Sequence, residues 1–155
     1  MPKSWKAHRG FVRVWKAIEP YIADAVMDHD IHYIYVIGYS HGAALTVLAH
    51  EYVWFNRPDI RANCYSFAFE APRVFCGRYP KELRPRWDHL MVFRTNNDIV
   101  TQVPPRIFGF RHIGALIKLK VPREKFIKHR KLDCVSAHYQ DNVILGIEEF
   151  MKQFK

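Results

Sequence analysis

Cysteine is scarce in this sequence, and its few cysteines form no recognisable framework. There are three, Cys64, Cys76 and Cys134, and neither their odd number nor their spacing suits disulfide pairing or a zinc site. Long apolar runs are also lacking, since no stretch approaches the about 18 uncharged apolar residues of a membrane-spanning helix. The basic stretch over residues 1–16 lacks the apolar run and the small-residue cleavage site of a secretory signal. We therefore expect reduced thiols and a cytoplasmic location.

Acidic residues are outnumbered by basic ones, which bears on the partners of the protein. The 155 residues include 24 Lys and Arg against 15 Asp and Glu, a net charge of +9. The basic residues are scattered, with denser regions at 73–86 and 118–131. Such a charge suits a solvated surface or an encounter with an anionic membrane. Nucleic-acid binding is not expected, because no nucleic-acid-binding motif accompanies the charge.

The first third of the chain shows a helix, a strand and a second helix. Apolar residues recur at helical spacing over residues 8–29, where Pro20 is expected to kink or split the helix. The continuous apolar run at 33–38 predicts a strand that is buried on both faces of a parallel sheet. Residues 41–55 are rich in Ala and Leu and predict the second helix.

The rest of the chain continues this alternation. Strands are expected at 63–69 and 89–95, and a fourth strand or hairpin arm at 113–122. An amphipathic helix is expected at 139–154. Alternating strands and helices predict an α/β fold with a mostly parallel sheet flanked by helices. No linker or repeat divides the chain, so we expect a single domain over residues 1–155.

The sequence Gly38-Tyr39-Ser40-His41-Gly42 matches the pattern G-x-S-x-G between a predicted strand and a predicted helix. This is the setting of a nucleophile elbow, a sharp turn that exposes a reactive serine. The glycines are expected because strand and helix come so close that side chains at the flanking positions would collide. The start of the helix offers the free backbone N–H of His41, which suits a developing oxyanion.

A nucleophilic serine requires a base, and the base requires a carboxylate that orients it. Hydrolases with this elbow place these residues in the order Ser, Asp, His. Asp98 follows the predicted third strand, at the end of the sheet where active sites gather, and His138 precedes the last helix. His112 is the competing base. A metal site that includes His41 is conceivable, but the spacing follows no ligand motif, so no metal or other cofactor is expected.

Six segments add to this pattern in a fixed order. They read AHRGFVRVWKAIEPYIADAV (7–26), VIGYSHGAALTVLAH (36–50), SFAFEAPRVF (66–75), VFRTNNDIVTQVPP (92–105), GFRHIG (109–114) and DCVSAHYQ (133–140). Together they resemble the class 3 (fungal-type) lipases, a branch of the α/β-hydrolases. The resemblance implies that Ser40 is the nucleophile, Asp98 the orienting carboxylate and His138 the base, with His112 a structural histidine. It also implies hydrolysis of lipid carboxylic esters, either acylglycerols or phospholipids.

Two other acidic residues are alternative candidates for the orienting group. Glu70 stands where the family usually has a small residue, and we expect it to make a local surface or turn contact. Asp133 is expected to cap or solvate the loop before His138. Asp98 is preferred because it alone was expected in a loop directly after a strand.

The sequence departs from the family ahead of residue 8, where the family has one or two strands and a hydroxyl-bearing oxyanion loop. We expect the N-terminal strands to be missing, so that the 33–38 strand becomes an open edge. The chain would then be the later part of a longer protein, or would pair this edge with a second copy or a partner. A second hypothesis follows, in which an inactive lipase-like domain binds lipid or a partner.

Overall fold

A four-stranded parallel sheet forms the centre of the fold in this computed structural model, which describes residues 5–154. The strands lie in the order β2-β3-β5-β7, and each pairs in parallel with its neighbour. Their bounds are β2 (Ile34–Tyr39), β3 (Cys64–Phe69), β5 (Leu90–Thr95) and β7 (Ala115–Leu119). The predicted α/β fold and its strands are confirmed, and residues 113–122 contain a parallel strand and not a hairpin arm.

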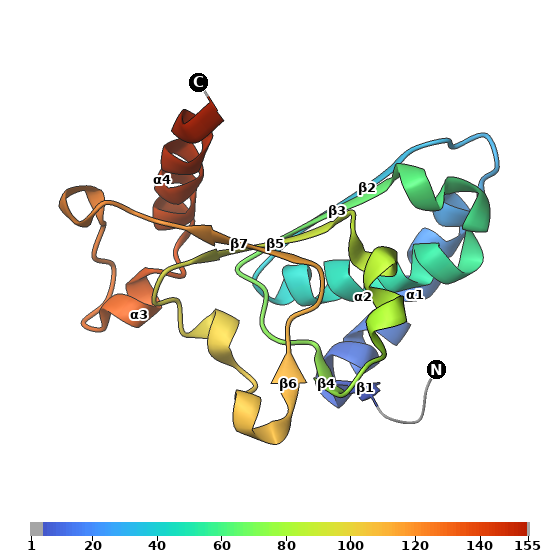
Figure 1. The fold of residues 1–155 in the computed structure, drawn as a ribbon, viewed down its shortest axis with the longest axis horizontal. Helices are drawn as coiled ribbons and strands as arrows, with labels where there is room; N and C mark the ends of the chain where they lie inside the picture. The colour runs from blue at the N-terminus through green and yellow to red at the C-terminus, as the bar shows by residue number, and fades with distance from the viewer. Residues whose placement is uncertain (1–4, 155) are drawn as a thin grey trace.

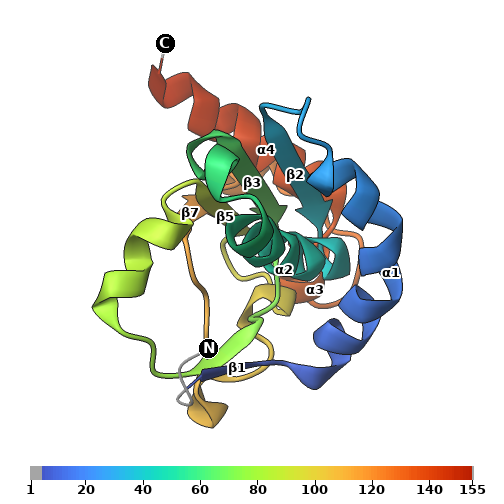
Figure 2. The same ribbon diagram turned by 90° about the vertical axis from the view of Figure 1, so that its right-hand side faces the viewer.

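Helices cover the two faces of the sheet unequally (Figure 1). The helices α1 (Arg9–Met27) and α2 (His41–Asn56) lie on one side, with α2 packed on β2 and β3 and α1 packed on α2. The helix α4 (Gln140–Met151) lies on the other side, against β5 and β7. Figure 2 shows the same layers with α2 in front of the sheet and α4 behind it. The helix α1 continues through Pro20, so the proline does not split it.

The α2 helix is apolar around most of its circumference because it lies between two layers. Ala43, Ala44 and Val53 are at most 1% exposed, and they contact the sheet or α1 in the core. None of the helices within residues 5–154 has the length and apolar composition required to cross a bilayer.

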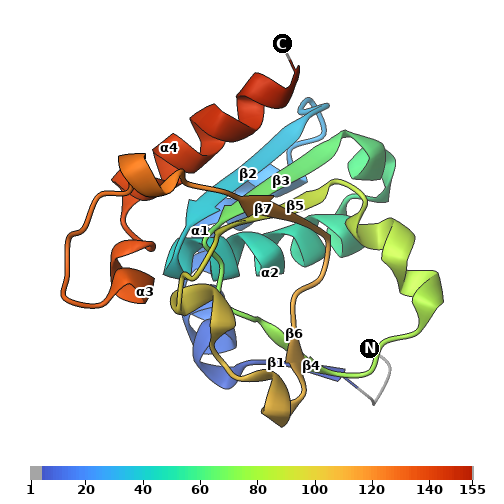
Figure 3. The same cartoon turned by 60° about the vertical axis from the view of Figure 1, so that its left-hand side comes forward.

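A second, smaller sheet lies beside the first, and the sequence did not predict it (Figure 3). It has the antiparallel order β1-β4-β6, formed by β1 (Trp5–Ala7), β4 (Phe75–Gly77) and β6 (Phe110–Arg111). Strands of two or three residues are too short to show an alternating pattern. Short helical turns connect the larger elements: η1 (Pro58–Asn63), η2 (Lys81–Trp87), η3 (Val100–Gln102), η4 (Arg106–Phe108), η5 (Arg123–Lys125) and α3 (Asp133–Ser136). A last turn, η6 (Lys152–Phe154), follows α4.

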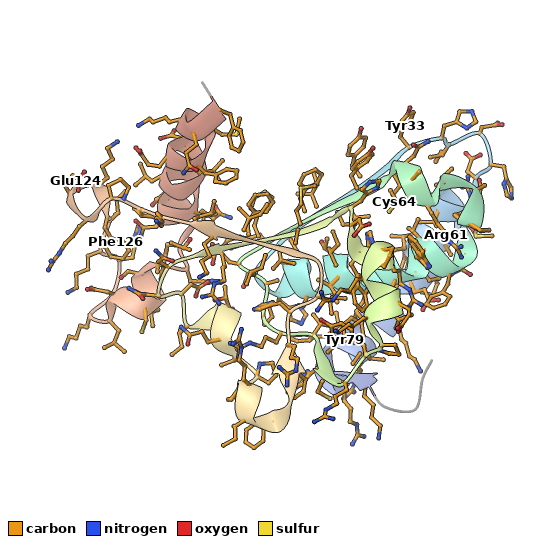
Figure 4. All side chains as sticks on the ribbon, viewed as in Figure 1. Tyr33, Arg61, Cys64, Tyr79, Glu124 and Phe126 are labelled. Carbon is orange, nitrogen blue, oxygen red and sulfur yellow. The ribbon has the colours of Figure 1, made fainter. Side chains whose placement is uncertain are left out.

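The face of β2 and β3 that points away from α2 carries large side chains with no helix from residues 5–154 against it. Tyr35 is 62% exposed and Ile37 is 68% exposed, so the prediction that β2 is buried on both faces is wrong. On β3, Tyr65, Phe67 and Phe69 point to this same side, and Tyr35 stacks on Tyr65. Figure 4 shows side chains, Tyr33 among them, standing off this side of the sheet. The name aromatic face is used below for five residues of β2 and β3: Tyr35, Ile37, Tyr65, Phe67 and Phe69.

The segment that leads into α4 is held by buried polar side chains. The amide nitrogen of Asn142 donates to the carbonyls of Ile127 (2.7 Å) and Ser136 (2.9 Å), and its oxygen accepts from the Ile127 N–H (2.9 Å). The Ser136 hydroxyl accepts hydrogen bonds from the N–H groups of His129 (3.1 Å) and Arg130 (2.9 Å). Both side chains are fully buried. These contacts fix the backbone directly before and after His138.

Candidate active site

Ser40 occupies the turn between β2 and α2 in a conformation that few residues adopt. Its backbone has φ 56° and ψ −121°, and its N–H donates to the Phe69 carbonyl at 2.9 Å. A Cβ at Gly38 would lie 2.4 Å from the Gly42 carbonyl oxygen and 2.4 Å from Thr46 Oγ1, so only glycine fits there. A Cβ at Gly42 would contact nothing within 4 Å. The predicted collision therefore applies to Gly38 and is wrong for Gly42.

The side chain of Ser40 begins a chain of two hydrogen bonds. Its Oγ donates to His138 Nε2 at 2.8 Å, and His138 Nδ1 donates to Asp98 Oδ2 at 2.8 Å. The Asp98 side chain is fully buried, and that of His138 is 18% exposed. This arrangement fixes the tautomer of neutral His138, with its proton on Nδ1 and its free electron pair facing Ser40. The three residues singled out from the sequence are thus brought together.

Asp98 remains ionised because its hydrogen bonds outweigh its burial. Burial by itself raises the pKa of Asp98, but the hydrogen bond from His138, together with the influence of neighbouring Glu70, lowers it below its usual range. Its second oxygen, Oδ1, accepts the N–H of Val100 at 2.8 Å. The N–H of Ile99 donates to the Cys134 carbonyl at 3.1 Å, which ties the Asp98 loop to the His138 segment. The carboxylate is thereby held facing the imidazole.

Glu70 also belongs to this site, which the sequence did not predict. It directly follows β3, has φ 54° and is fully buried, so the expected surface contact is wrong. Its Oε1 accepts hydrogen bonds from Thr95 N (2.7 Å) and Thr95 Oγ1 (2.6 Å). The expectation that Asp98 alone lies in a loop directly after a strand is therefore wrong, because Glu70 also lies directly after one. The sequence did carry one signal that Glu70 belongs to the site, namely an acidic residue at a position where the family usually has a small one.

His112 is held apart from Ser40 by a different partner. Its Nε2 donates to the Thr101 carbonyl at 2.9 Å. Burial, followed by the charges of Arg73, Arg94 and Arg106, lowers the pKa of His112 to about 4, and the Thr101 bond only partly opposes this. A neutral imidazole that donates to a backbone carbonyl supports the loop after Asp98. This geometry agrees with the structural role that the resemblance implied.

The residues on either side of Ser40 contribute a ring contact and a free N–H. The His41 ring is exposed and packs on Phe11 of α1, with ring centroids 5.4 Å apart. Its N–H is the first of α2, and the first N–H groups of a helix have no acceptor within the helix. The Tyr39 ring stacks on His138 at 5.2 Å, and its hydroxyl donates to the His138 carbonyl. Burial, followed by the charges of Glu70 and Asp98, raises the pKa of Tyr39 to about 12.

Asp133 lies away from the hydrogen-bond chain. It begins α3, and its carboxylate, 68% exposed, pairs with Lys128 at 3.3 Å.

A hollow of about 350 Å³ opens beside His138, and Tyr39, Tyr139, Gln140 and Asp141 also line it. This hollow provides space next to the base.

Ligand atoms of Glu70, Asp98 and His138 lie within 4.8 Å of one another, a spacing that a metal ion would accept. A metal bound through Nδ1 of His138 would displace the proton that this nitrogen donates to Asp98. The observed hydrogen bonds thus suit proton transfer from Ser40 better than metal coordination.

The sheet order, the serine between strand and helix, and the Ser-His-Asp geometry define a protein with the α/β-hydrolase fold. Comparison with known proteins gives a more specific result. The family Lipase (class 3) matches residues 1–108, and the chain belongs to this family.

Solved structures of fungal proteins share the fold. Lipase II from Rhizopus niveus superposes with a TM-score of 0.64 at 25% identity, over 77% of this chain and 46% of that one. A point mutant of MDLA from Penicillium cyclopium gives 0.68 at 20% identity, over 93% and 62%. The triacylglyceride lipase from Rhizomucor miehei gives 0.64 at 21% identity, over 78% and 48%. The chain therefore spans about half to two thirds of the length of these relatives.

Proposed function

We propose that this chain carries the nucleophile, base and orienting acid of a serine hydrolase that cleaves carboxylic esters of lipids, either acylglycerols or phospholipids. One observation carries the proposal: Ser40, strained at the elbow, donates to His138, which donates to buried Asp98, with both bonds 2.8 Å long. Strained backbone persists where the surrounding structure holds it, and such positions cluster at active sites. Membership of the class 3 lipase family supports a lipid ester as the substrate.

The reaction follows from the direction of these hydrogen bonds. His138 Nε2 takes the Ser40 proton as Oγ forms a bond to the ester carbonyl carbon. The resulting oxyanion accepts a hydrogen bond from the His41 N–H, and the positive end of the α2 dipole stabilises it. His138 then gives its proton to the departing alkoxide, which leaves as the alcohol. Water, deprotonated by His138, then attacks the acyl carbon of the acyl-enzyme. The bond between that carbon and Ser40 Oγ breaks, His138 returns its proton to Oγ, and the fatty acid leaves.

Asp98 stabilises the imidazolium that forms twice in this cycle. Its negative charge is already fixed in place before the reaction, so no reorganisation is required when His138 becomes charged. The residues ahead of the elbow do not match the family's hydroxyl-bearing oxyanion loop, and the His41 N–H is the donor that this proposal assigns. Removal of one such donor lowers turnover by about 10²–10³ in other hydrolases.

The alternative function is an inactive lipase-like module that binds lipid or a partner. The aromatic face favours it, and so does β2, which among residues 5–154 pairs with β3 alone and forms the edge of its sheet. An exposed apolar face beside such an edge suits association with a second copy or a partner chain. An anionic membrane surface is the other proposed partner, on account of the net charge of +9. The cytoplasmic location remains a prediction.

Labelling with a fluorophosphonate probe tests the hydrolase proposal. We expect a covalent adduct on Ser40 in the folded chain, located by mass spectrometry, and none in Ser40→Ala. His138→Gln, which removes the base, should slow labelling by at least about 10².

The matched control is His112→Gln, which alters another partly buried histidine, one that bonds to the Thr101 carbonyl and not to Ser40. This variant should be labelled at a rate close to that of the parent chain. Folded parent protein that takes up no label would contradict the proposal and favour the inactive module.

A further inference from the structure

Two buried carboxyl groups meet at the end of the hydrogen-bond chain, and the reaction described above employs only one of them. Glu70 and Asp98 are both fully buried. One oxygen of each lies within 4.8 Å of the other and of a ring nitrogen of His138. Two carboxylates this close in a buried site do not both ionise at neutral pH, because their charges repel in a medium of low dielectric constant. One of the two must therefore hold a proton.

The surrounding donors determine which group holds it. Asp98 accepts hydrogen bonds from His138 and from the Val100 N–H, one on each oxygen, and both favour its ionised form. On Glu70, Thr95 donates only to Oε1, while Oε2 is buried and has no donor among the described residues. A proton on Oε2 would remove this unsatisfied group by donating to Asp98. Burial, followed by the hydrogen bond to Asp98, raises the pKa of Glu70 well above its usual range.

We propose that Glu70 is a neutral carboxylic acid that donates a hydrogen bond to Asp98 and so sets the basicity of His138. It is a positioning residue, since it acts on the base through Asp98 and does not contact the serine. The inference rests on the proposed function for its catalytic meaning, because His138 is the base of that reaction. The carboxyl pair itself exists whether or not the chain is an enzyme.

The electrostatic consequence follows from the sharing of charge. A donated hydrogen bond withdraws negative charge from the Asp98 oxygens, so the imidazolium form of His138 gains less from its neighbour. His138 then stays neutral, and able to accept the Ser40 proton, at a lower pH than it would beside a lone carboxylate. Tyr39, whose pKa the charges of Glu70 and Asp98 help to raise to about 12, is neutral at physiological pH and adds no charge beside the pair.

The test is an NMR titration of the His138 ring in Ser40→Ala protein, compared with the same protein carrying Glu70→Gly or Glu70→Gln. Glycine suits the positive φ of 54° at this position, and it removes the carboxyl group without straining the turn. We expect Glu70→Gly to move the His138 titration midpoint up by about one pH unit. Glu70→Gln, whose amide can still donate to Asp98, should return the midpoint close to that of the Ser40→Ala parent.

A merely structural Glu70 would lower stability in Glu70→Gly and leave the His138 midpoint where it was, and that result would overturn the inference. The carboxyl resonance of Glu70 provides a second measurement, which is needed if the glycine variant does not fold. A Glu70 that is protonated at pH 7 in Ser40→Ala protein supports the inference, and one that is ionised there overturns it.

The fluorophosphonate labelling rate separates this inference from the proposed function. With Ser40 intact, the acid limb of the rate-against-pH profile should move up in Glu70→Gly and be restored in Glu70→Gln. If the parent chain is labelled and the limb does not move, the inference fails and the hydrolase proposal stands. If the parent chain is never labelled but the His138 midpoint moves, the carboxyl pair stands and the hydrolase proposal fails.

Discussion

Positive backbone φ angles mark the candidate site at the scale of single residues. Among residues 5–154, the non-glycine residues with positive φ are Ser40 (56°), Glu70 (54°) and Asn97 (68°). They follow β2, β3 and β5 respectively, and Asn97 precedes Asp98. Each such conformation is unfavourable, so the packing around it must over-determine it. Three neighbouring parallel strands therefore each end in a strained turn that aims a side chain at one place.

The neutral state of half-buried His112 makes stability depend on pH. Its pKa falls from 6.5 in the unfolded chain to about 4 in the fold, so its contribution is present in full above pH 6.5. As pH falls from 6.5 towards 4, the unfolded state binds the proton first and this contribution is lost. We expect a little over about 3 kcal/mol of pH-dependent stability from this group across that range.

Urea unfolding of the parent chain and His112→Gln at pH 7, 5.5 and 4.5 measures this effect. The stability advantage of the parent should shrink as the pH falls, because glutamine does not titrate. Parallel stability curves for the two proteins would contradict the assignment of a neutral His112.

Some of the site could be predicted from residue patterns and some could not. Ser40, Asp98 and His138 were identified because each lies at a junction of strand, loop and helix in the expected order. The burial of Glu70 could not be predicted, because it depends on how closely the turn after β3 approaches Asp98.

At the scale of elements, β2 has two unlike faces. Val36 packs towards the core beneath α2, whereas Ile37 is 68% exposed on the aromatic face. We expect Ile37→Thr to change the free energy of unfolding by less than about 0.5 kcal/mol, since it removes no buried contact. The same change should reduce self-association in sedimentation velocity experiments, because it lowers the apolar character of the open edge.

The matched control is Val36→Thr, one residue away on the opposite face of the same strand. It places a hydroxyl towards the core and should lower stability by about 1–2 kcal/mol without altering association. A monomeric parent chain, or equal association in Ile37→Thr, would contradict a role for the aromatic face in self-pairing.

Element length decided which elements were predictable. Strands of five or six residues and the three long helices were found from their apolar runs and spacing. The strands β1, β4 and β6 have only two or three residues each, and their backbones pair with segments far away in the sequence. A local sequence pattern does not reveal such pairing. The exposure of one face of β2 could not be predicted from the sequence either. An apolar run shows that a strand can be buried, but it does not show which elements pack against it.

At the scale of the whole molecule, the net charge of +9 predicts association with anionic surfaces. Binding to vesicles that contain phosphatidylserine should exceed binding to pure phosphatidylcholine at low salt. It should fall by at least about tenfold between 50 and 500 mM salt, because screening shortens the reach of the charge. Co-sedimentation measures both quantities. Equal, salt-insensitive binding to the two vesicle types would instead attribute membrane binding to the aromatic face.

The hydrogen-bond chain also has a consequence for the order of events during synthesis. Ser40 and His138 are 98 residues apart in sequence, and Asp98 is 40 residues from His138. A nascent chain that has completed β2 and α2 therefore has the serine in place without its base. On the proposed mechanism, the hydroxyl becomes reactive only after the segment that carries His138 has docked and closed the longest loop in the site. Covalent labelling of Ser40 would thus count the molecules that have finished folding. Truncated or half-folded chains would not react with the probe.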